Sequence, residues 1–215
     1  MAKKSLTPAD RALLDAARRG DAAAVRAALA AGADLEARDE EGRTPLLRAA
    51  LADQVAAAEV LVGAGADVNA QDDRQDSAWL VTGVTGSVAM MRALLPGGPD
   101  LALTNRFGGV SVIPASERGH VAYVRAVLAE TGVDVNHVNR LGWTALLEAV
   151  ILGDGGRTHQ EVVEVLLAAG ADPLLPDADG TSALAHADRR GFHGIADLLR
   201  AAEARAGSRD GEPGR

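Results

Sequence analysis

The sequence predicts an all-α solenoid, an array of about six repeated units that each contain a turn and two antiparallel helices. The first observation is a short phrase around an aspartate, which returns at spacings of 33, 33, 34 and 38 residues. The second is a cap-like Thr or Ser ten residues after most of these aspartates. A near-constant period of this length is typical of stacked repeats, because one unit is too small to bury its own apolar face. The aspartates are Asp34, Asp67, Asp100, Asp134 and Asp172.

The start of each first helix is marked by residue type. Two examples are Gly42-Arg43-Thr44-Pro45-Leu46 and Gly142-Trp143-Thr144-Ala145-Leu146. The Thr or Ser hydroxyl can cap a free backbone N–H, and Pro suits the first helical position because it has no N–H to satisfy. The preceding glycine supplies a turn residue with a positive φ. We expect the six first helices to begin near Asp10, Thr44, Ser77, Val110, Thr144 and Ser182.

A second helix follows each first helix after a short break, such as Arg19-Gly20 or Arg118-Gly119. It carries bulkier apolar residues at helical spacing, including Leu166, which we expect to be buried. Glycines such as Gly32 and Gly170 stand where a left-handed residue commonly ends a helix. Burial is therefore expected to be spread over many small contacts between neighbouring units.

This pattern resembles the ankyrin repeat, and the resemblance covers nearly the whole chain. It implies L-shaped units with β-hairpin or turn fingertips that project beyond the helices, and a concave groove lined by fingertips and first helices. We expect one ankyrin repeat domain over residues 6–203 and a disordered tail over 207–215. The segments 136–149 and 106–115 also look like those of small stand-alone bacterial ankyrin repeat proteins, a likeness that implies no particular reaction.

Composition argues against several functions. The net charge is −8 and the pI is near 5.1, whereas nucleic acid or an anionic membrane requires clustered Lys and Arg. The chain has no Cys, which excludes a disulfide scaffold and a thiolate metal site. No segment is long enough to span a membrane, and the first residues lack the apolar core of a signal peptide. We expect a cytoplasmic monomer without cofactor or metal, or a secreted protein if a signal peptide has been removed.

Two places depart from the repeat. In the third unit Gln75 replaces the turn glycine, Gly83 lies inside the first helix, and Pro96-Gly97-Gly98-Pro99 follows the second. These changes indicate either a hinge or contact site, or drift in a tolerant unit. In the fifth unit the segment 153–160 adds about five residues between the two helices and contains three glycines. Insertions in repeat arrays form loops that often lie on the binding face, so we expect a mobile loop that is either functional or incidental.

The candidate binding surface is the groove that the resemblance implies, at the residues around each turn glycine and at the ends of the first helices. In the fourth and fifth units these positions hold an apolar cluster with arginines at its rim. Trp and Arg are enriched among residues that dominate binding energy. The candidate binding residues are Arg106, Phe107, Glu117, Arg118, Arg140, Leu141, Trp143, Ile151, Leu152 and Arg190.

This surface predicts a non-enzymatic protein-interaction module. Its partner, which the sequence does not identify, would offer an aliphatic or aromatic anchor beside acidic groups. The alternative is that Phe107 and Trp143 only cover neighbouring turns and that the arginines are ordinary solvated helix ends. Trp79 stands at an apolar helix position and is expected to be part of the core.

The chain has no strong catalytic motif, such as a phosphate loop, a zinc-protease motif or a nucleophile elbow. The one enzymatic alternative is a small-molecule or catalytic pocket around Glu148, His137 and the 153–160 loop, which contains His159. A partly buried Glu148 close to His137 would serve as a general base, whereas an exposed Glu148 would have no such role. A closed pocket or a raised pKa at Glu148 would favour chemistry, and an open groove would favour a protein partner.

Overall fold

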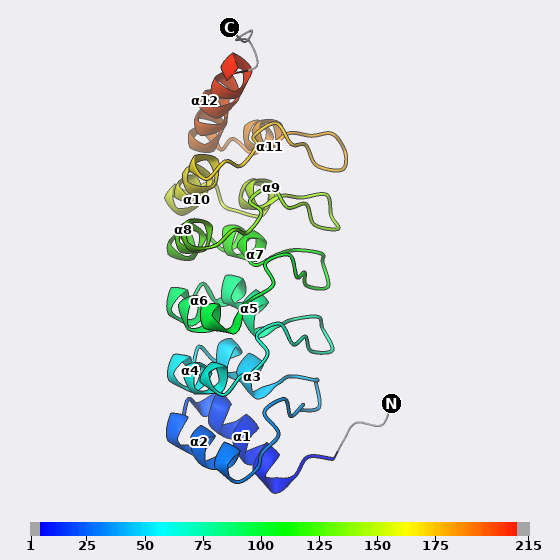
Figure 1. Cartoon of the computed structure of the whole chain (residues 1–215). Helices are drawn as coiled ribbons and strands as arrows, with labels where there is room; N and C mark the ends of the chain where they lie inside the picture. The colour runs from blue at the N-terminus through cyan, green and yellow to red at the C-terminus, as the bar shows by residue number, and fades with distance from the viewer. Residues whose placement is uncertain (1–4, 210–215) are drawn as a thin grey trace, which may run out of the picture. The chain divides into compact units, whose positions relative to one another are not determined.

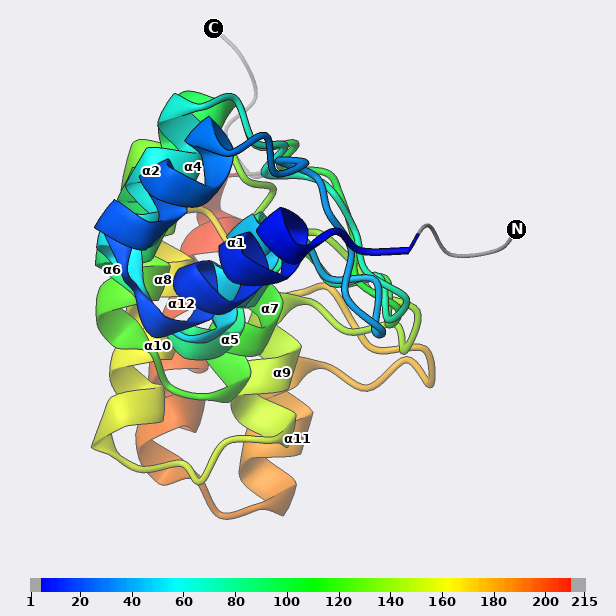
Figure 2. The same ribbon diagram turned by 90° about the horizontal axis from the view of Figure 1, so that it is seen from below.

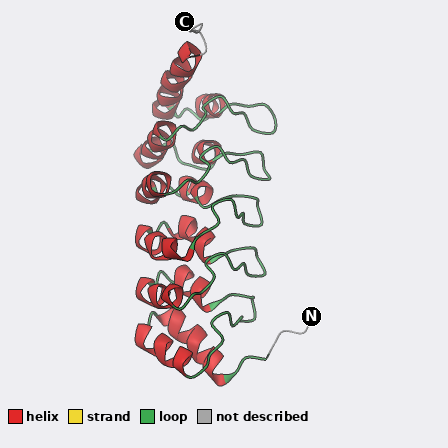
Figure 3. Cartoon of the chain, viewed as in Figure 1, coloured by secondary structure: helices red, strands yellow, loops and turns green. Residues whose placement is uncertain are grey.

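The computed structural model describes residues 5–209, and in this range it contains twelve α-helices, one short 3-10 helix and no β-strand (Figures 1 and 3). The fingertips expected as hairpins or turns are therefore turns. The first six helices are α1 (Pro8–Arg19), α2 (Ala22–Ala30), α3 (Pro45–Leu51), α4 (Val55–Gly63), α5 (Ala78–Thr85) and α6 (Val88–Leu94), followed by the 3-10 helix η1 (Leu95–Gly97). The others are α7 (Val112–Glu117), α8 (Val121–Glu130), α9 (Ala145–Ile151), α10 (Arg157–Ala168), α11 (Ala183–Arg189) and α12 (His193–Arg209).

The chain divides into two compact units, one through Arg106 and one from Phe107, and each contains three helix pairs. In the N-terminal unit, α3 packs between α1 and α5, and α4 packs between α2 and α6. In the C-terminal unit, α9 packs between α7 and α11, and α10 packs between α8 and α12. The helices of each unit therefore form two rows, as the repeat predicts, while the expectation of a single domain stays a prediction.

Long loops connect each pair to the next and project to one side of the helices of their own unit (Figures 1 and 2). We call them fingers and number them by the repeat whose first helix follows. They comprise finger 2 (31–44), finger 3 (64–77), finger 4 (98–111), finger 5 (131–144) and finger 6 (169–182). The tip of finger 2 is closed by a bond from the N–H of Gly42 to the carbonyl of Asp39, with Gly42 at φ +78°. Fingers 5 and 6 repeat this turn at Gly142 and Gly180.

Hydroxyl groups cap the first helices where the sequence predicts them. Thr44, Ser77, Thr144 and Ser182 each accept the backbone N–H three residues further on, at 3.1–3.2 Å. Helix α7 is different, because it begins at Val112 rather than near Val110. Val110 has no hydroxyl, and the Ser111 side chain makes no capping bond. The helix is accordingly the shortest, with 6 residues.

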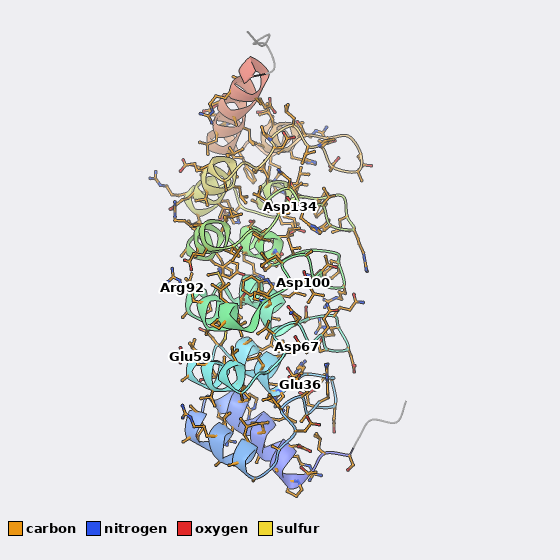
Figure 4. The ribbon with its side chains drawn as sticks, in the orientation of Figure 1. Glu36, Glu59, Asp67, Arg92, Asp100 and Asp134 are labelled. Atoms are coloured by element: carbon orange, nitrogen blue, oxygen red, sulfur yellow. The ribbon has the colours of Figure 1, made fainter. Side chains whose placement is uncertain are left out.

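The repeated aspartates have a structural role in each finger. The carboxylate of Asp67 accepts the N–H of Asn69, two residues on, at 2.8 Å, which is an Asx turn. The backbone N–H of Asp67 in turn donates to the Glu36 side chain of the preceding finger at 2.9 Å. In the same way Asp100 donates to Asn69, and in the C-terminal unit Asp172 donates to Asn136, both at 2.8 Å. Figure 4 shows Glu36, Asp67 and Asp100 in succession along the bases of the fingers.

The apolar faces meet between the two rows of helices. Trp79 and Leu166 are fully buried, as expected, and small residues such as Ala49 and Ala50 allow α3 to approach its neighbours. Between residues 5 and 209, none of the helices has the length and apolar character needed to cross a bilayer. Helix α12 continues to Arg209, so residues 207–209 of the expected disordered tail are helical, and residues 210–215 lie outside the described range.

The irregular third repeat keeps the turn and the helix pair of the others and adds the 3-10 helix η1. Gln75 adopts φ +62° at the turn position, although it is not glycine. Gly83 is buried inside α5. Gly97 lies directly against Val68, so that a side chain at this position would collide with finger 3. The departures in sequence thus correspond to one strained turn and two closely packed glycines.

Candidate functional site

The fingertips of the fourth and fifth repeats carry exposed apolar side chains. Phe107 and Leu141, each directly before a turn glycine, are 51% and 50% exposed. The same position holds Glu41, Arg74 and Asp179 in the other fingers, so only these two tips are apolar. The N–H of Arg140 donates to the carbonyl of Phe107 at 2.9 Å, which places the two apolar tips on adjacent, bonded fingers.

The end of α9 adds a second apolar element. Leu152, which caps this helix, is 48% exposed, and Ile151 before it is half-buried. The corresponding residues at the end of α7 are Glu117, half-buried, and Arg118, exposed. Trp143 at the base of finger 5 is half-buried, and its backbone N–H donates to the Asn139 side chain at 3.0 Å.

The arginines expected at the rim differ in their surroundings. Arg190 donates to the carbonyls of Ile151 and Gly153, at 2.8 and 2.9 Å, and its guanidinium lies 4.6 Å from the centre of the Phe192 ring. It therefore holds the segment after α9 against the last repeat. Arg106, in the N-terminal unit, lies 4.0 Å from the carboxylate of Asp76. Arg118 and Arg140 are exposed.

Only the first half of the 153–160 segment is a loop. Residues 157–160 form the first turn of α10, so the connection is limited to 153–156. Gly153 is packed against the His159 ring and Gly155 against the Phe192 ring, and the Gly155 carbonyl accepts a bond from Gln160 at 3.0 Å. The glycines interpreted as a source of mobility instead permit close packing.

The His159 side chain connects this loop to the end of α7. Its Nε2 lies 3.0 Å from the carbonyl of Glu117, and its Nδ1 lies 2.8 Å from the carboxylate of Asp154. The backbone N–H of Asp154 also points at Nδ1, at 3.4 Å, so the ring is held by the loop on one side and by the end of α7 on the other. Asp154 has a lowered pKa because its carboxylate accepts the N–H of Gly156 and also faces His159.

Glu148 is the most unusual ionisable group of the unit. It lies on α9, is only 6% exposed, and accepts a hydrogen bond of 2.8 Å from the side-chain amide of Asn139. Burial and the nearby carboxylate of Glu117 raise the pKa of Glu148 to about 7, although the Asn139 bond opposes this. A carboxyl group with such a pKa would suit a general base or the recognition of a cation.

The three residues of the catalytic alternative have separate partners. Glu148 bonds to Asn139, the Nε2 of His137 lies 2.7 Å from the carbonyl of Gly108, and His159 bonds to Glu117 and Asp154. No hydrogen bond joins any two of them. Residues 5–209 also contain no cluster of three His, Cys, Asp or Glu side chains arranged to hold a metal ion. This geometry gives the catalytic alternative no support.

Several hollows lie away from Glu148. Two of them, of about 320 and 260 Å³, lie beside α12 in the C-terminal unit, and two lie in the N-terminal unit. One has a volume of about 250 Å³ beneath finger 2, with Leu6, Ala37 and Glu36 in its wall. The other, of about 350 Å³, is lined by charged residues of α1 and finger 2, including Arg11 and Glu41. Both are open to solvent and neither contains a residue of the candidate binding set.

Sequence reasoning missed Asn139, which connects finger 5 to α9. Its Oδ1 accepts the N–H groups of Leu141 and Trp143, while its Nδ2 donates to Glu148. Fingers 2 and 6 place an aspartate here, with a basic residue nine positions later: Asp39 lies 3.7 Å from Arg48, and Asp177 lies 2.7 Å from His186. Compared with these two fingers, the fifth repeat has Asn in place of Asp and Glu in place of the basic residue, a difference that the sequence shows.

Comparison with known proteins agrees with the repeat architecture. A family model described as ankyrin repeats (3 copies) matches residues 3–72 and 80–177. The ankyrin repeat protein YahD of Escherichia coli (strain K12) is 50% identical over 99 residues, which are 46% of this chain and 49% of YahD. The chain thus matches about half the length of this curated relative.

Solved structures match over most of the chain. The ankyrin repeat domain ABAYE2397 of Acinetobacter baumannii AYE is 49% identical, with a TM-score of 0.84 over 89% of this chain and 97% of that one. The ankyrin repeat protein EF0377 is 35% identical, with a TM-score of 0.85 and the same shares of both chains. With its repeated aspartates, capped first helices and fingers, the chain belongs to the ankyrin repeat family.

Proposed function

We propose that the chain binds a partner protein through the C-terminal unit, at the fingertips and first-helix ends of the fourth and fifth repeats. Ankyrin repeats are a general protein-interaction module, and repeat arrays of this kind present extended concave surfaces. The observation that carries the proposal is the exposure of Phe107 and Leu141 on adjacent fingers, at a position that is charged in the other repeats.

Exposed apolar side chains at scattered positions are common and need no explanation. Phe107, Leu141 and Leu152, however, all occupy the groove positions that the repeat pattern predicts. Burying a Leu or Phe side chain in an interface gains about 1.5–3 kcal/mol, so two such anchors would supply much of the affinity of a specific complex. The arginine rim contributes less than the sequence suggests, because Arg190 is engaged by the loop after α9.

The test compares two double variants with matched exposure. Phe107→Ser with Leu141→Ser removes both fingertip anchors, whereas Val138→Ser with Leu174→Ser removes side chains that are 50% and 53% exposed elsewhere on the unit. A partner is captured by the wild-type chain from the cells that produce it, and its affinity for each variant is measured. We expect the first variant to weaken binding at least tenfold and the second to bind like wild type. Equal binding by all three proteins, or no specific partner of the wild type, would overturn the proposal.

A further inference from the structure

Glu148 is a buried acid without a counter-ion. It is 94% buried, and within residues 5–209 the only hydrogen bond to its side chain comes from the neutral amide of Asn139. The nearest charge that acts on it belongs to Glu117, another carboxylate. Buried charges in proteins are normally paired, because an unpaired charge is costly to remove from water. Glu148 therefore lacks the partner that its position calls for.

Two other repeats have an acid and a basic residue at the equivalent pair of positions. In the second repeat the turn aspartate Asp39 faces Arg48 on α3, and in the sixth Asp177 faces His186 on α11. In the fifth repeat the anion lies on the helix, and the finger offers Asn139 in place of a cation. The same structural position thus changes from an acid that faces a basic residue to a buried carboxylate that faces a neutral amide.

The second oxygen of this carboxylate keeps a small contact with solvent. Oε1 of Glu148 takes the bond from Asn139, and Oε2 takes no hydrogen bond from the protein. Oε2 is not among the fully enclosed polar atoms without a partner, so it keeps contact with solvent. This contact is small, because Glu148 as a whole is 6% exposed.

The carboxylate is also connected to the apolar fingertip. Asn139 accepts the N–H of Leu141 at 2.9 Å and donates to Glu148 at 2.8 Å, so a single side chain joins the two. A partner segment seated on Leu141 would consequently pass close to Glu148 and to Glu117. Leu141 and Glu148 thus belong to the fifth repeat, and Glu117 belongs to the fourth.

We infer that the partner inserts a basic side chain, an arginine or a lysine, at the Oε2 atom of Glu148 while an apolar residue rests on Leu141 and Phe107. This inference rests on the proposed function and specifies the chemistry of the partner. Guanidinium and ammonium groups offer several N–H donors to a carboxylate, and a partly desolvated ion pair of this kind fixes the register of a bound segment. The raised pKa of Glu148 is consistent with a site whose counter-ion is supplied by another molecule.

The experiment uses displayed peptides of random sequence, twelve residues long, selected at pH 8 on the full chain. Selection is carried out in parallel on wild type, on Glu148→Gln and on the Phe107→Ser, Leu141→Ser double variant. Glu164→Gln, on the outer helix α10, is the matched control for the loss of one negative charge. Circular dichroism establishes that each variant is folded before selection.

We expect wild-type binders to combine an apolar residue with an Arg or Lys at a constant spacing, with the basic residue enriched several-fold over the library. Replacing that Arg by citrulline, its neutral isostere, should weaken binding to wild type and Glu164→Gln at least tenfold and leave binding to Glu148→Gln unchanged. An equal effect of citrulline on all proteins, or binders without basic residues, would overturn the inference and leave the apolar groove intact. Failure to select any peptide that distinguishes wild type from the double variant would overturn the proposed function as well.

Discussion

The side-chain amide of Asn139 donates to the carboxylate of Glu148 at 2.8 Å, across the angle between finger 5 and α9. In this one bond the fifth repeat differs from the second and sixth, where a turn aspartate meets Arg48 or His186 of the first helix. The exchange conserves the contact between finger and helix but reverses the location of the negative charge. It also leaves that charge without compensation inside the unit.

The first prediction concerns the stability of the Glu148→Gln variant as pH changes. Because the pKa of Glu148 is raised to about 7 in the folded state, the protonated form stabilises the fold below about pH 4.5, and this contribution is lost as pH rises through 7. A shift of this size corresponds to at most about 3 kcal/mol. Glutamine resembles the protonated acid at every pH. We therefore expect the variant to match wild type near pH 4 and to be more stable above pH 7, by urea unfolding.

The control for this experiment is Glu164→Gln, an exposed change on α10 that should alter stability little across the range. If the difference between Glu148→Gln and wild type did not grow with pH, Glu148 would not titrate as the structure requires. The quantity to compare is the difference in unfolding free energy between Glu148→Gln and wild type at each pH. It cancels the opposite trend of Asp154 and Asp177, whose lowered pKa values make the fold less stable as pH falls.

A second prediction tests the packing of the loop after α9. Gly155 and Gly180 have almost the same backbone, at φ +71° and +76°, but only Gly155 lies against a ring, that of Phe192. Alanine at either position incurs the left-handed backbone penalty of about 1 kcal/mol. Gly155→Ala should lower the free energy of unfolding by about 1–3 kcal/mol more than Gly180→Ala does, because the Phe192 ring has to move. Thermal or urea unfolding of the two variants measures the loss of stability. Equal losses would contradict the prediction, because the Phe192 ring would then move aside at no cost.

A third prediction concerns the strained turn of the third repeat. Gln75 is exposed and adopts φ +62°, a region that glycine enters without a steric penalty. Gln75→Gly should stabilise the chain by about 0.5–1 kcal/mol, since relief of the backbone strain exceeds the added entropy of the unfolded chain. The carbonyl of residue 75, which accepts a bond from Gln71, is retained in the variant. A lower unfolding midpoint in urea would contradict this account of the turn.

A fourth prediction addresses the links between successive fingers. Asn136 accepts the N–H of Asp172 at 2.8 Å and donates to the carbonyl of Gly170 at 3.2 Å. Asn136→Ala removes both bonds and should cost about 1–3 kcal/mol. Hydrogen exchange at the Asp172 amide should rise in the variant. Val138→Ala, an exposed change two residues away, serves as the control. If the Asp172 amide exchanged at a similar rate in both variants, the bonds of Asn136 would not stabilise the link between fingers 5 and 6.

Much of the fold was predictable because each signal acts locally. A hydroxyl at Thr44 or Thr144 caps a helix through its own backbone, without help from distant residues. The same logic explains the two shifted starts: α1 begins at Pro8, after the Thr7 cap, rather than near Asp10, and α7 begins later because Val110 occupies the cap position without a hydroxyl. The spacing of the aspartates likewise reflects an Asx turn within each finger.

The candidate site was less accessible from sequence, because its contacts join residues that only the fold brings together. The bond from Asn139 to Glu148 depends on the angle between a finger and a helix. Arg190 was expected in the groove, yet it reaches back to Ile151 and Gly153 across the insertion. The glycines of that insertion illustrate the ambiguity: the sequence alone does not distinguish a glycine that permits motion from one, such as Gly155, that permits close packing.

The ladder of side chains between fingers has a consequence for the growth of such arrays. Asn69 and Asn136 each present an acceptor to the finger that comes after them, and the equivalent place in finger 6 is occupied by Leu174. A leucine offers no such acceptor. Finger 4 carries Ala102 at this place and is nevertheless followed by a fifth repeat, so the side-chain link strengthens particular joints and is not a condition for adding a repeat.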